Sequence, residues 1–201
     1  YLDNIQFNKR SWQQRNRIPN NNQFLWITLP VKSKGRYYQS INQVEIDYSR
    51  HPFDRIIKIL KNNYSKNENY LEVIEMLLNV FKKKVSKLSE LNILLIKEIC
   101  NFLKIENKTF VKSSTLDISS TKGQLLFDIT KKLNGNTYIS ADGSEVFFKE
   151  KNPFIESKIC LEYHNYNHPT YKQRTKNFVK YCSIVDLLFN EGANAKNFFK
   201  K

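Results

Sequence analysis

The spacing of apolar residues changes along the chain, and the changes predict where one kind of element gives way to another. Near the start, a polar loop at 19–23 precedes the apolar run 24–29. Polar clusters between apolar runs are typical of hairpin loops, and an unbroken apolar run predicts a strand that is buried on both faces. A weaker alternation over 41–47 predicts one more short strand.

In the middle of the chain the apolar spacing is that of a helix. Leucine and isoleucine recur at helical intervals in the runs 53–64, 70–88 and 89–105. Such a stripe covers one face of a helix and is stable when it is buried against another apolar surface. We therefore expect three amphipathic helices, and we interpret 52–104 as a helical insertion within a single α/β domain that spans 1–201.

Farther along, predicted strands and helices alternate. Short runs rich in Val, Ile, Tyr and Phe predict strands, and runs with helical apolar spacing lie between them. The expected strands are 108–114, 137–140 and 158–164, and the expected helices are 121–134, 144–151 and 183–192. An alternation of this kind favours an α/β fold with a mostly parallel sheet and covering helices.

The formal net charge of +14 favours a partner that carries phosphate groups, such as nucleic acid, a nucleotide or an anionic lipid. The alternative is that the excess lysine lies on solvated faces and reflects composition alone. Only five glycines occur, so a glycine-rich phosphate loop is not expected. A phosphate would then be held by basic side chains such as Lys9, Arg10, Arg15 and Arg17 or by the N-terminus of a helix.

Composition also bounds the compartment and the chemistry. No apolar run approaches the roughly 20 residues that cross a bilayer, and no signal peptide is visible, so we expect a cytoplasmic protein without a membrane span. The three cysteines, at 100, 160 and 182, are far apart in the sequence and odd in number. This pattern predicts buried free thiols and contains no zinc motif, so no metal site is expected.

Polar side chains follow the predicted strands of the second half. Ligands of open α/β sheets bind beyond the carboxyl ends of the strands, and Ser113, Ser114, Asp142 and His168 come at or after such ends. Histidine can take up a proton at neutral pH, so His168 is the candidate general base. Serine and aspartate also cap helices and form turns. A polar loop in which His168 bonds a backbone carbonyl is the alternative.

Several stretches of the chain resemble the WbqC-like protein family in order and in spacing. They are 1–18, 24–32, 111–114, 163–173 and 178–192. This family consists of bacterial proteins associated with gene clusters for O-antigen and other surface polysaccharides. Its members begin earlier, with a strand, a His-Gln-Pro segment and a helix. The resemblance therefore implies that this chain lacks an N-terminal strand and helix.

The resemblance implies that the first 18 residues form the end of a strand and a turn into a hairpin. In this arrangement Trp12 would stack on a base or a sugar, and basic side chains would meet a diphosphate. The expected substrate-binding residues are Gln6, Lys9, Trp12, Arg15, Arg17, Ser113, Ser114, Tyr171 and Gln173. The alternative is that Trp12 is a core anchor and Arg17 a surface charge of a strand.

The resemblance also implies a sugar-tailoring enzyme, which transfers an acyl or aminoacyl group to the amine of a nucleotide-linked amino sugar. The acyl donor would be free or bound to a carrier. His168 would deprotonate the amine, and Asp3 or Asp142 would orient the sugar. Ser113 and Ser114, or backbone donors, would stabilise an oxyanion. The sequence identifies no cofactor and no oligomeric state.

Two other classes of function stay open at this point. A non-catalytic protein that binds RNA would use the same basic surface, although the chain has no known nucleic-acid-binding framework. A glycosyltransferase is disfavoured because the chain has no D-x-D metal motif and is short for the usual architectures.

Overall fold

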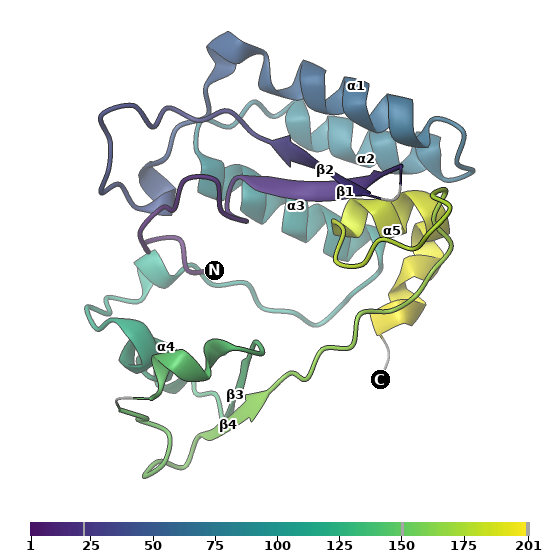
Figure 1. The fold of residues 1–201 in the computed structure, drawn as a ribbon. Helices are drawn as coiled ribbons and strands as arrows, with labels where there is room; N and C mark the ends of the chain where they lie inside the picture. Colours follow the sequence, from purple (N-terminus) through teal and green to yellow (C-terminus); the bar gives the residue numbers. More distant parts are fainter. Residues whose placement is uncertain (22, 150, 200–201) are drawn as a thin grey trace. The chain divides into compact units, whose positions relative to one another are not determined.

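The computed structural model describes residues 1–21, 23–149 and 151–199 (Figure 1). The chain forms two compact units. The larger unit consists of Asp3–Thr109 and Pro169–Lys201, and the smaller unit consists of Tyr1–Leu2 and Phe110–His168. The single domain spanning 1–201, with its helical insertion at 52–104, stays a prediction.

A β-hairpin opens the larger unit. Strand β1 (Arg15–Asn20) pairs antiparallel with β2 (Gln23–Thr28), and Arg17 lies opposite Trp26. The predicted hairpin is therefore confirmed. The expectation that the second strand is buried on both faces is wrong, because none of its described residues is fully buried, whereas Ile18 of β1 is. A two-stranded antiparallel sheet can leave one face to solvent, and this hairpin does so.

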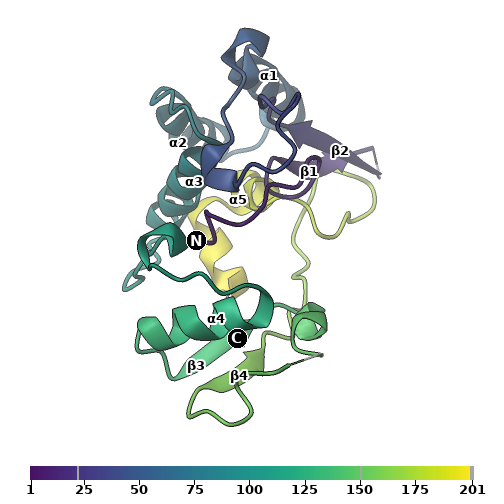
Figure 2. The ribbon, with the colours of Figure 1, turned by 90° about the vertical axis from the view of Figure 1, so that its left-hand side faces the viewer.

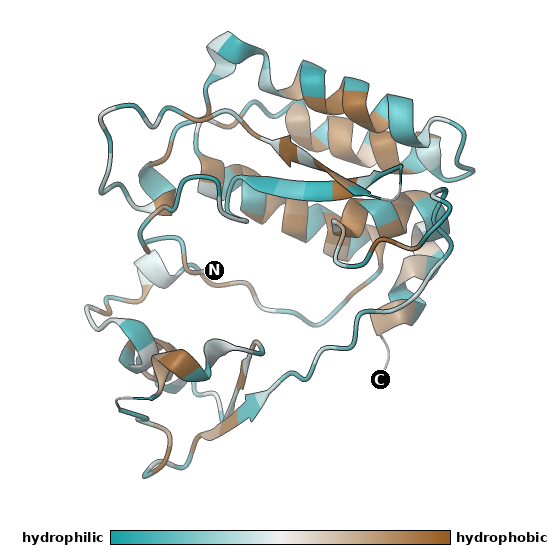
Figure 3. Ribbon diagram, viewed as in Figure 1, coloured by the Kyte–Doolittle hydropathy of each residue, from teal (hydrophilic) through white to brown (hydrophobic). Residues whose placement is uncertain are grey.

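Three helices follow, as the apolar spacing predicts: α1 (Pro52–Tyr64), α2 (Tyr70–Phe81) and α3 (Leu88–Phe102). The helix predicted over 70–88 is shorter in the structure. It ends at Phe81, and Lys84 has a positive φ of 45° that a helix does not allow. Figure 3 shows that each of these helices carries both hydrophobic and hydrophilic residues along its length.

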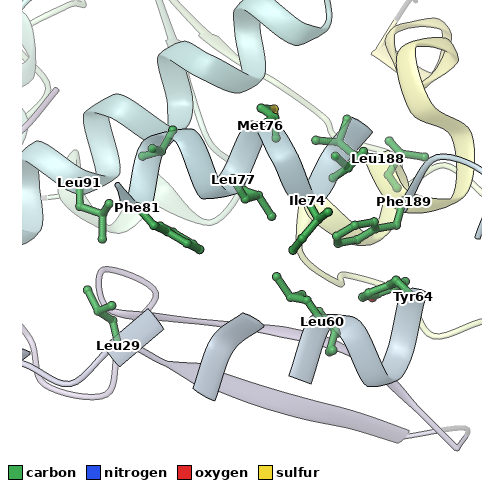
Figure 4. Packing of buried hydrophobic residues seen from close by; sticks show 14 of the residues in the cluster. Leu29, Leu60, Tyr64, Ile74, Met76, Leu77, Phe81, Leu91, Leu188 and Phe189 are labelled. Atoms are coloured by element: carbon green, nitrogen blue, oxygen red, sulfur yellow. The ribbon is translucent and has the colours of Figure 1, made fainter. Parts of the chain in front are cut away.

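The core of the larger unit forms where α2 packs against α1, α3 and the last α-helix, α5 (Ile184–Glu191). Ser183 caps α5, and its hydroxyl accepts a hydrogen bond from the Val185 amide. Figures 1 and 2 show the hairpin on one side of α2 and α3. Figure 4 shows Leu60 and Tyr64 of α1 meeting side chains of α2 and α5.

The short strand predicted at 41–47 is wrong. Ile41–Gln43 is instead a 3₁₀ helix, and Ile46 makes one isolated bridge to Val31. Ile41 and Val44 are both buried, and their spacing of three residues matches one turn of a 3₁₀ helix. Alternation in so short a run is compatible with either structure, and packing decides between them.

The smaller unit contains helix α4 (Lys122–Lys132) and two strands, β3 (Thr137–Ser140) and β4 (Cys160–Tyr163). These strands are parallel, with Ser140 opposite Tyr163. The residues that the structure describes thus give an α/β fold of five α-helices and two small sheets, one antiparallel and one parallel. The sequence predicts a mostly parallel sheet. Among the described residues the parallel pairing is limited to β3 and β4, and they form no larger parallel sheet.

The predicted strand at 108–114 is also wrong. Its backbone bonds to the first residue of the chain: the Tyr1 amino group donates to the Val111 carbonyl at 2.6 Å, and the Ser113 amide donates to the Tyr1 carbonyl at 2.8 Å. Ser113–Thr115 is a 3₁₀ turn. Ser144–Phe147, expected as part of a helix at 144–151, is likewise a short 3₁₀ segment; residue 150 of that range lies outside the described residues.

None of the helices in the described ranges has the length and the apolar character needed to cross a bilayer. The longest, α3, has 15 residues, against the roughly 20 that the hydrocarbon core requires.

Candidate functional site

Arginines of β1 and aromatic residues of β2 share one face of the hairpin. Side chains of a strand alternate between its two faces, and residues directly opposite each other on paired strands share a face. Because Arg17 lies opposite Trp26, Arg15 and Arg17 share their face with Phe24 and Trp26. Trp12, just before β1, joins them. We call these five residues the cation–aromatic face.

Cations and rings alternate on this face. The guanidinium carbon of Arg15 lies 4.0 Å from the centroid of Trp26, and that of Arg17 lies 4.7 Å from Phe24 and 5.5 Å from Trp12. The two indoles are 5.0 Å apart and tilted by 49°. Contacts of this length between a guanidinium and a ring are attractive, so the rings and cations hold one another in place.

Much of the face is open to solvent. Trp12 is 60% exposed and Phe24 is 45% exposed, so Trp12 is not a core anchor. Exposed aromatic rings next to fixed guanidinium groups suit a ligand that has a flat ring and a phosphate. The substrate-binding roles of Trp12, Arg15 and Arg17 stay predictions, but the structure brings these three side chains together.

Contacts with the segment before α5 fix the hairpin in place. The Arg17 Nε donates to the Tyr181 carbonyl at 2.8 Å, and the Ser183 amide donates to the Arg17 carbonyl at 2.7 Å. Between them lies Cys182, whose thiol pKa is raised to about 11, first by burial and then by the negative charge of Asp186. The thiol is therefore protonated at neutral pH and is a poor nucleophile.

A buried carboxylate that sequence reasoning missed lies near the start of α5. Asp186 is 1% exposed. The Tyr64 hydroxyl donates to its Oδ1 at 2.8 Å, and the Tyr171 hydroxyl and the Gln173 amide donate to its Oδ2 at 2.7 and 2.8 Å. Asn190 adds a donor at 3.2 Å. Tyr171 and Gln173, predicted to bind substrate, are thus placed in this hydrogen-bond network.

Burial and hydrogen bonding act in opposite directions on Asp186. Burial raises the pKa of its carboxyl, and the bonds from Tyr171, Tyr64, Gln173 and Asn190 lower it and offset part of that rise. Burial, followed by the charge of Asp186, raises the pKa of both tyrosines well above the ordinary value. Both phenols consequently stay protonated and act as donors.

The amide of Gln173 also ties a loop to this network. Its Nε2 donates to the Val179 carbonyl at 3.1 Å, and its Oε1 accepts from the Val179 amide at 2.7 Å. The sequence carried one signal for the network, which is an acidic residue at the centre of the otherwise apolar run 184–189. A lone charge on an apolar helix face requires polar partners when it is buried.

The remaining predicted residues of the larger unit lie before the hairpin. Asp3 is buried, and its carbonyl accepts from the Asn42 amide at 2.8 Å. Gln6 is exposed and forms an isolated bridge with Ser40, and Lys9 is exposed. None of these contacts tests a role in binding or catalysis.

In the smaller unit, Asp142 and the loop 164–168 lie together at the carboxyl ends of β3 and β4. The two carboxylate oxygens of Asp142 accept from the amides of Asn165 and Tyr166, each at 2.9 Å. The Tyr166 ring lies 5.8 Å from His164 and 6.0 Å from His168. Asp142 therefore fixes the start of the loop that carries the candidate base.

The two predicted serines differ in their surroundings. Ser113 is buried and Ser114 is exposed. A different pair, Ser140 and Ser144, has hydroxyls 2.6 Å apart at the end of β3. Cys160 is exposed and Cys100 and Cys182 are half-buried, so the expectation of buried thiols is wrong. Among the described residues, no group of three or more His, Cys, Asp or Glu is arranged to hold a metal ion.

Comparison with known proteins gives one family and one curated relative. The model of the WbqC-like protein family matches residues 1–198. A protein of Mycobacterium tuberculosis, described as "Uncharacterized protein Rv1507c", is 30% identical over 200 residues, which cover 98% of this chain and 85% of that protein. No solved structure matches this chain.

Proposed function

Because the chain belongs to the WbqC-like protein family, we propose that it modifies a sugar in the biosynthesis of bacterial surface polysaccharide, such as O-antigen. Family membership suggests a protein of a polysaccharide gene cluster. The reaction that we propose is transfer of an acyl or aminoacyl group to the amine of a nucleotide-linked amino sugar.

The observation that carries this proposal is the cation–aromatic face. A nucleotide-linked sugar presents a flat base, a sugar ring and a diphosphate. Trp12 and Phe24 offer exposed rings on which a base or a sugar can stack, and the guanidinium groups of Arg15 and Arg17 lie within 4.0 to 5.5 Å of ring centroids on the same face. Arginine suits phosphate because its planar fork donates two parallel hydrogen bonds.

The transfer itself needs a base and a leaving group. The amine nitrogen of the sugar forms a bond to the acyl carbon, and the bond from that carbon to the oxygen or sulfur of the donor breaks. In our proposal His168 accepts the proton that the amine loses and returns it to the departing hydroxyl or thiol. Asp142 acts through the loop: its bonds to the Asn165 and Tyr166 amides position His168. Asp3 remains the candidate for orienting the sugar.

A thermal-shift screen tests the binding step. A ligand present at 100 times its Kd stabilises the native state by about 2.7 kcal/mol, and for a chain of this size that raises the Tm by roughly 5–11 °C. We expect one class of nucleotide-linked amino sugar to give such a shift. Trp12→Ala should abolish it, whereas Tyr38→Ala, which removes a side chain that is 91% exposed outside the face, should not.

The charge of +14 favours one other candidate, a non-catalytic protein that binds RNA. Its affinity would fall steeply with salt and would tolerate many sequences. Bulk tRNA in the same screen separates the two. A shift with tRNA alone, lost at high salt, would replace our proposal, whereas a shift with a nucleotide-linked sugar alone would support it. The third hypothesis is transfer of the sugar itself, as in a glycosyltransferase. It would appear as release of the nucleotide from the nucleotide-linked sugar.

A further inference from the structure

The larger unit contains a cavity of about 370 Å³ between the hairpin, α1, α2, α3 and the start of α5. Its wall is mostly apolar and includes Leu29, Leu60, Leu77, Phe81 and Leu95. Figure 4 shows Leu60 pointing toward Leu77 and Phe81 across this part of the core. The space is a pocket that opens to solvent, because Trp12 and Ile96 in its wall are 60% and 43% exposed. Small-molecule sites are concave and lined mainly by apolar side chains, so this pocket suits a ligand.

The size and lining of the cavity indicate what that occupant is. A cavity of about 150 Å³ lined by Leu, Ile and Phe stays dry and binds benzene, and small-molecule sites begin at about 300 Å³. At about 370 Å³ this cavity has more than twice the space that accepts benzene. Its apolar wall offers water few hydrogen-bond partners. An aliphatic chain of medium length fits both properties.

One edge of the cavity is polar, and two residues of the cation–aromatic face lie in it. Trp12 and Arg15 both line the cavity. The Arg15 Nε is buried and has no hydrogen-bond partner within the described part of the chain. A buried donor without a partner is costly. A turn of the Arg15 side chain toward the cavity would bring its guanidinium, with five N–H donors, to an oxygen atom of a ligand. Asn92, also in the wall, already donates to the Gln13 carbonyl at 2.9 Å.

We propose that the cavity binds the acyl chain of the donor substrate and that Arg15 holds an oxygen of its head group. This inference rests on the proposed function, since it gives the acyl donor a site. It also narrows that function, because an aminoacyl group would bring a charged ammonium against an apolar wall, which is costly. The transferred group is therefore a simple aliphatic acyl group.

Isothermal titration calorimetry on the full chain tests the proposal without any turnover. The probes are straight-chain fatty acids of four to twelve carbons and their coenzyme A thioesters, with coenzyme A alone as the control. Burying one methylene strengthens binding about fourfold. We expect the affinity to rise by about this factor with each methylene until the cavity is full. Tighter binding of the thioester than of the acid would identify the thioester as the source of the chain.

Matched variants show where the acyl chain binds. Leu95→Phe fills the cavity and should weaken binding of a ten-carbon chain at least tenfold, whereas Leu71→Phe, at an α2 position that is 76% exposed, should leave it unchanged. Arg15→Gln should weaken every chain length by the same factor, and Arg55→Gln on the exposed side of α1 should not. If Leu95→Phe lowers the Tm, the variant Ile99→Phe, at another position in the same wall, is used in its place.

The result that would overturn the proposal is an absence of saturable binding, or an affinity that depends on neither chain length nor Leu95→Phe. These outcomes are separate from failure of the proposed function. If the acyl chain binds in the cavity as expected and no sugar is acylated, the proposed transfer reaction is wrong and the inference of an acyl-binding cavity stands. If a sugar is acylated at a rate that chain length and Leu95→Phe do not change, the cavity inference is wrong and the transfer reaction stands.

Discussion

Removing the hydroxyls that bond to Asp186 tests whether this buried carboxylate is held by the two tyrosines. Tyr64→Phe and Tyr171→Phe each delete one donor and keep the ring, including the stacking of residue 64 on Phe189 at 4.4 Å between centroids. A hydrogen bond to a charged group contributes about 1.5–3 kcal/mol. Each variant should therefore lose that much stability, which for a chain of this size lowers the Tm by roughly 3–12 °C.

The two losses should not add. Tyr64 donates to Oδ1 and Tyr171 to Oδ2 of the same carboxylate. Once one donor is gone, the pKa of Asp186, already raised by burial, rises further. A larger fraction of the carboxyl is then protonated. For that fraction the second deletion removes a bond to a neutral group, which contributes only about 0.5–1.5 kcal/mol. The double variant should cost less than the sum.

The pH dependence has a definite sign. Because the folded pKa of Asp186 is raised above its ordinary value of 3.8, protonation favours the folded state, and the cost of the buried charge appears as the pH rises through the folded pKa. The tyrosine donors stabilise the charged form. The stability lost in either variant should therefore be largest near pH 8 and should shrink as the pH falls toward 4.

Urea unfolding, followed by circular dichroism between pH 4 and 8, measures these differences. Tyr38→Phe is the control, since Tyr38 is 91% exposed and a surface change of this kind stays within about 0.5 kcal/mol. Losses below that level in both tyrosine variants would refute the network as described. Losses that add fully and do not vary with pH would refute the charge on Asp186.

Other positions give further predictions. Ile18→Ala, in a fully buried β1 side chain, should cost about 2–5 kcal/mol in urea unfolding, and a loss under 1 kcal/mol would mean that the hairpin does not pack on the core. Gly192→Ala should cost about 1–3 kcal/mol, because residue 192 has φ +55° and a Cβ there would overlap the Asn69 side chain; combining it with Asn69→Ala should recover only part of that loss. With a disulfide reagent at pH 7.5, the exposed Cys160 should react first and Cys182, with a pKa of about 11, should react slowly until the pH approaches that value. A fast phase that survives Cys160→Ser would contradict this assignment.

The helices could be predicted because their signal is local and repeated. Leu77, Val80 and Phe81 are buried on one side of α2, as their spacing requires. A short run contains too few repeats of the apolar spacing to predict its secondary structure. The run 41–47 alternates enough to suggest a strand, but Ile41 and Val44 are three residues apart and are both buried, which suits the 3₁₀ turn.

The site could be predicted only in part for the same reason. Trp12, Arg15 and Arg17 are close in sequence and lie on or beside one strand, so a hairpin brings them together. The Asp186 network joins α1, α5 and the segment before α5, and its tyrosines are 122 and 15 residues away from the aspartate in the chain. Contacts over such separations depend on the whole fold. The sequence therefore marks the aspartate, as a lone acid in an apolar run, but not its partners.

The measurement that tests the central claim most directly is mass spectrometry of a nucleotide-linked amino sugar incubated with the protein and an acyl coenzyme A thioester. The account predicts that the sugar gains the mass of one acyl group at its amine, that free thiol appears in equal amount, and that His168→Ala abolishes both changes without altering the Tm. Full activity in His168→Ala would remove this residue from the mechanism. An unmodified sugar across a panel of nucleotides, sugars and acyl chains, together with a thermal shift from tRNA alone, would contradict the account.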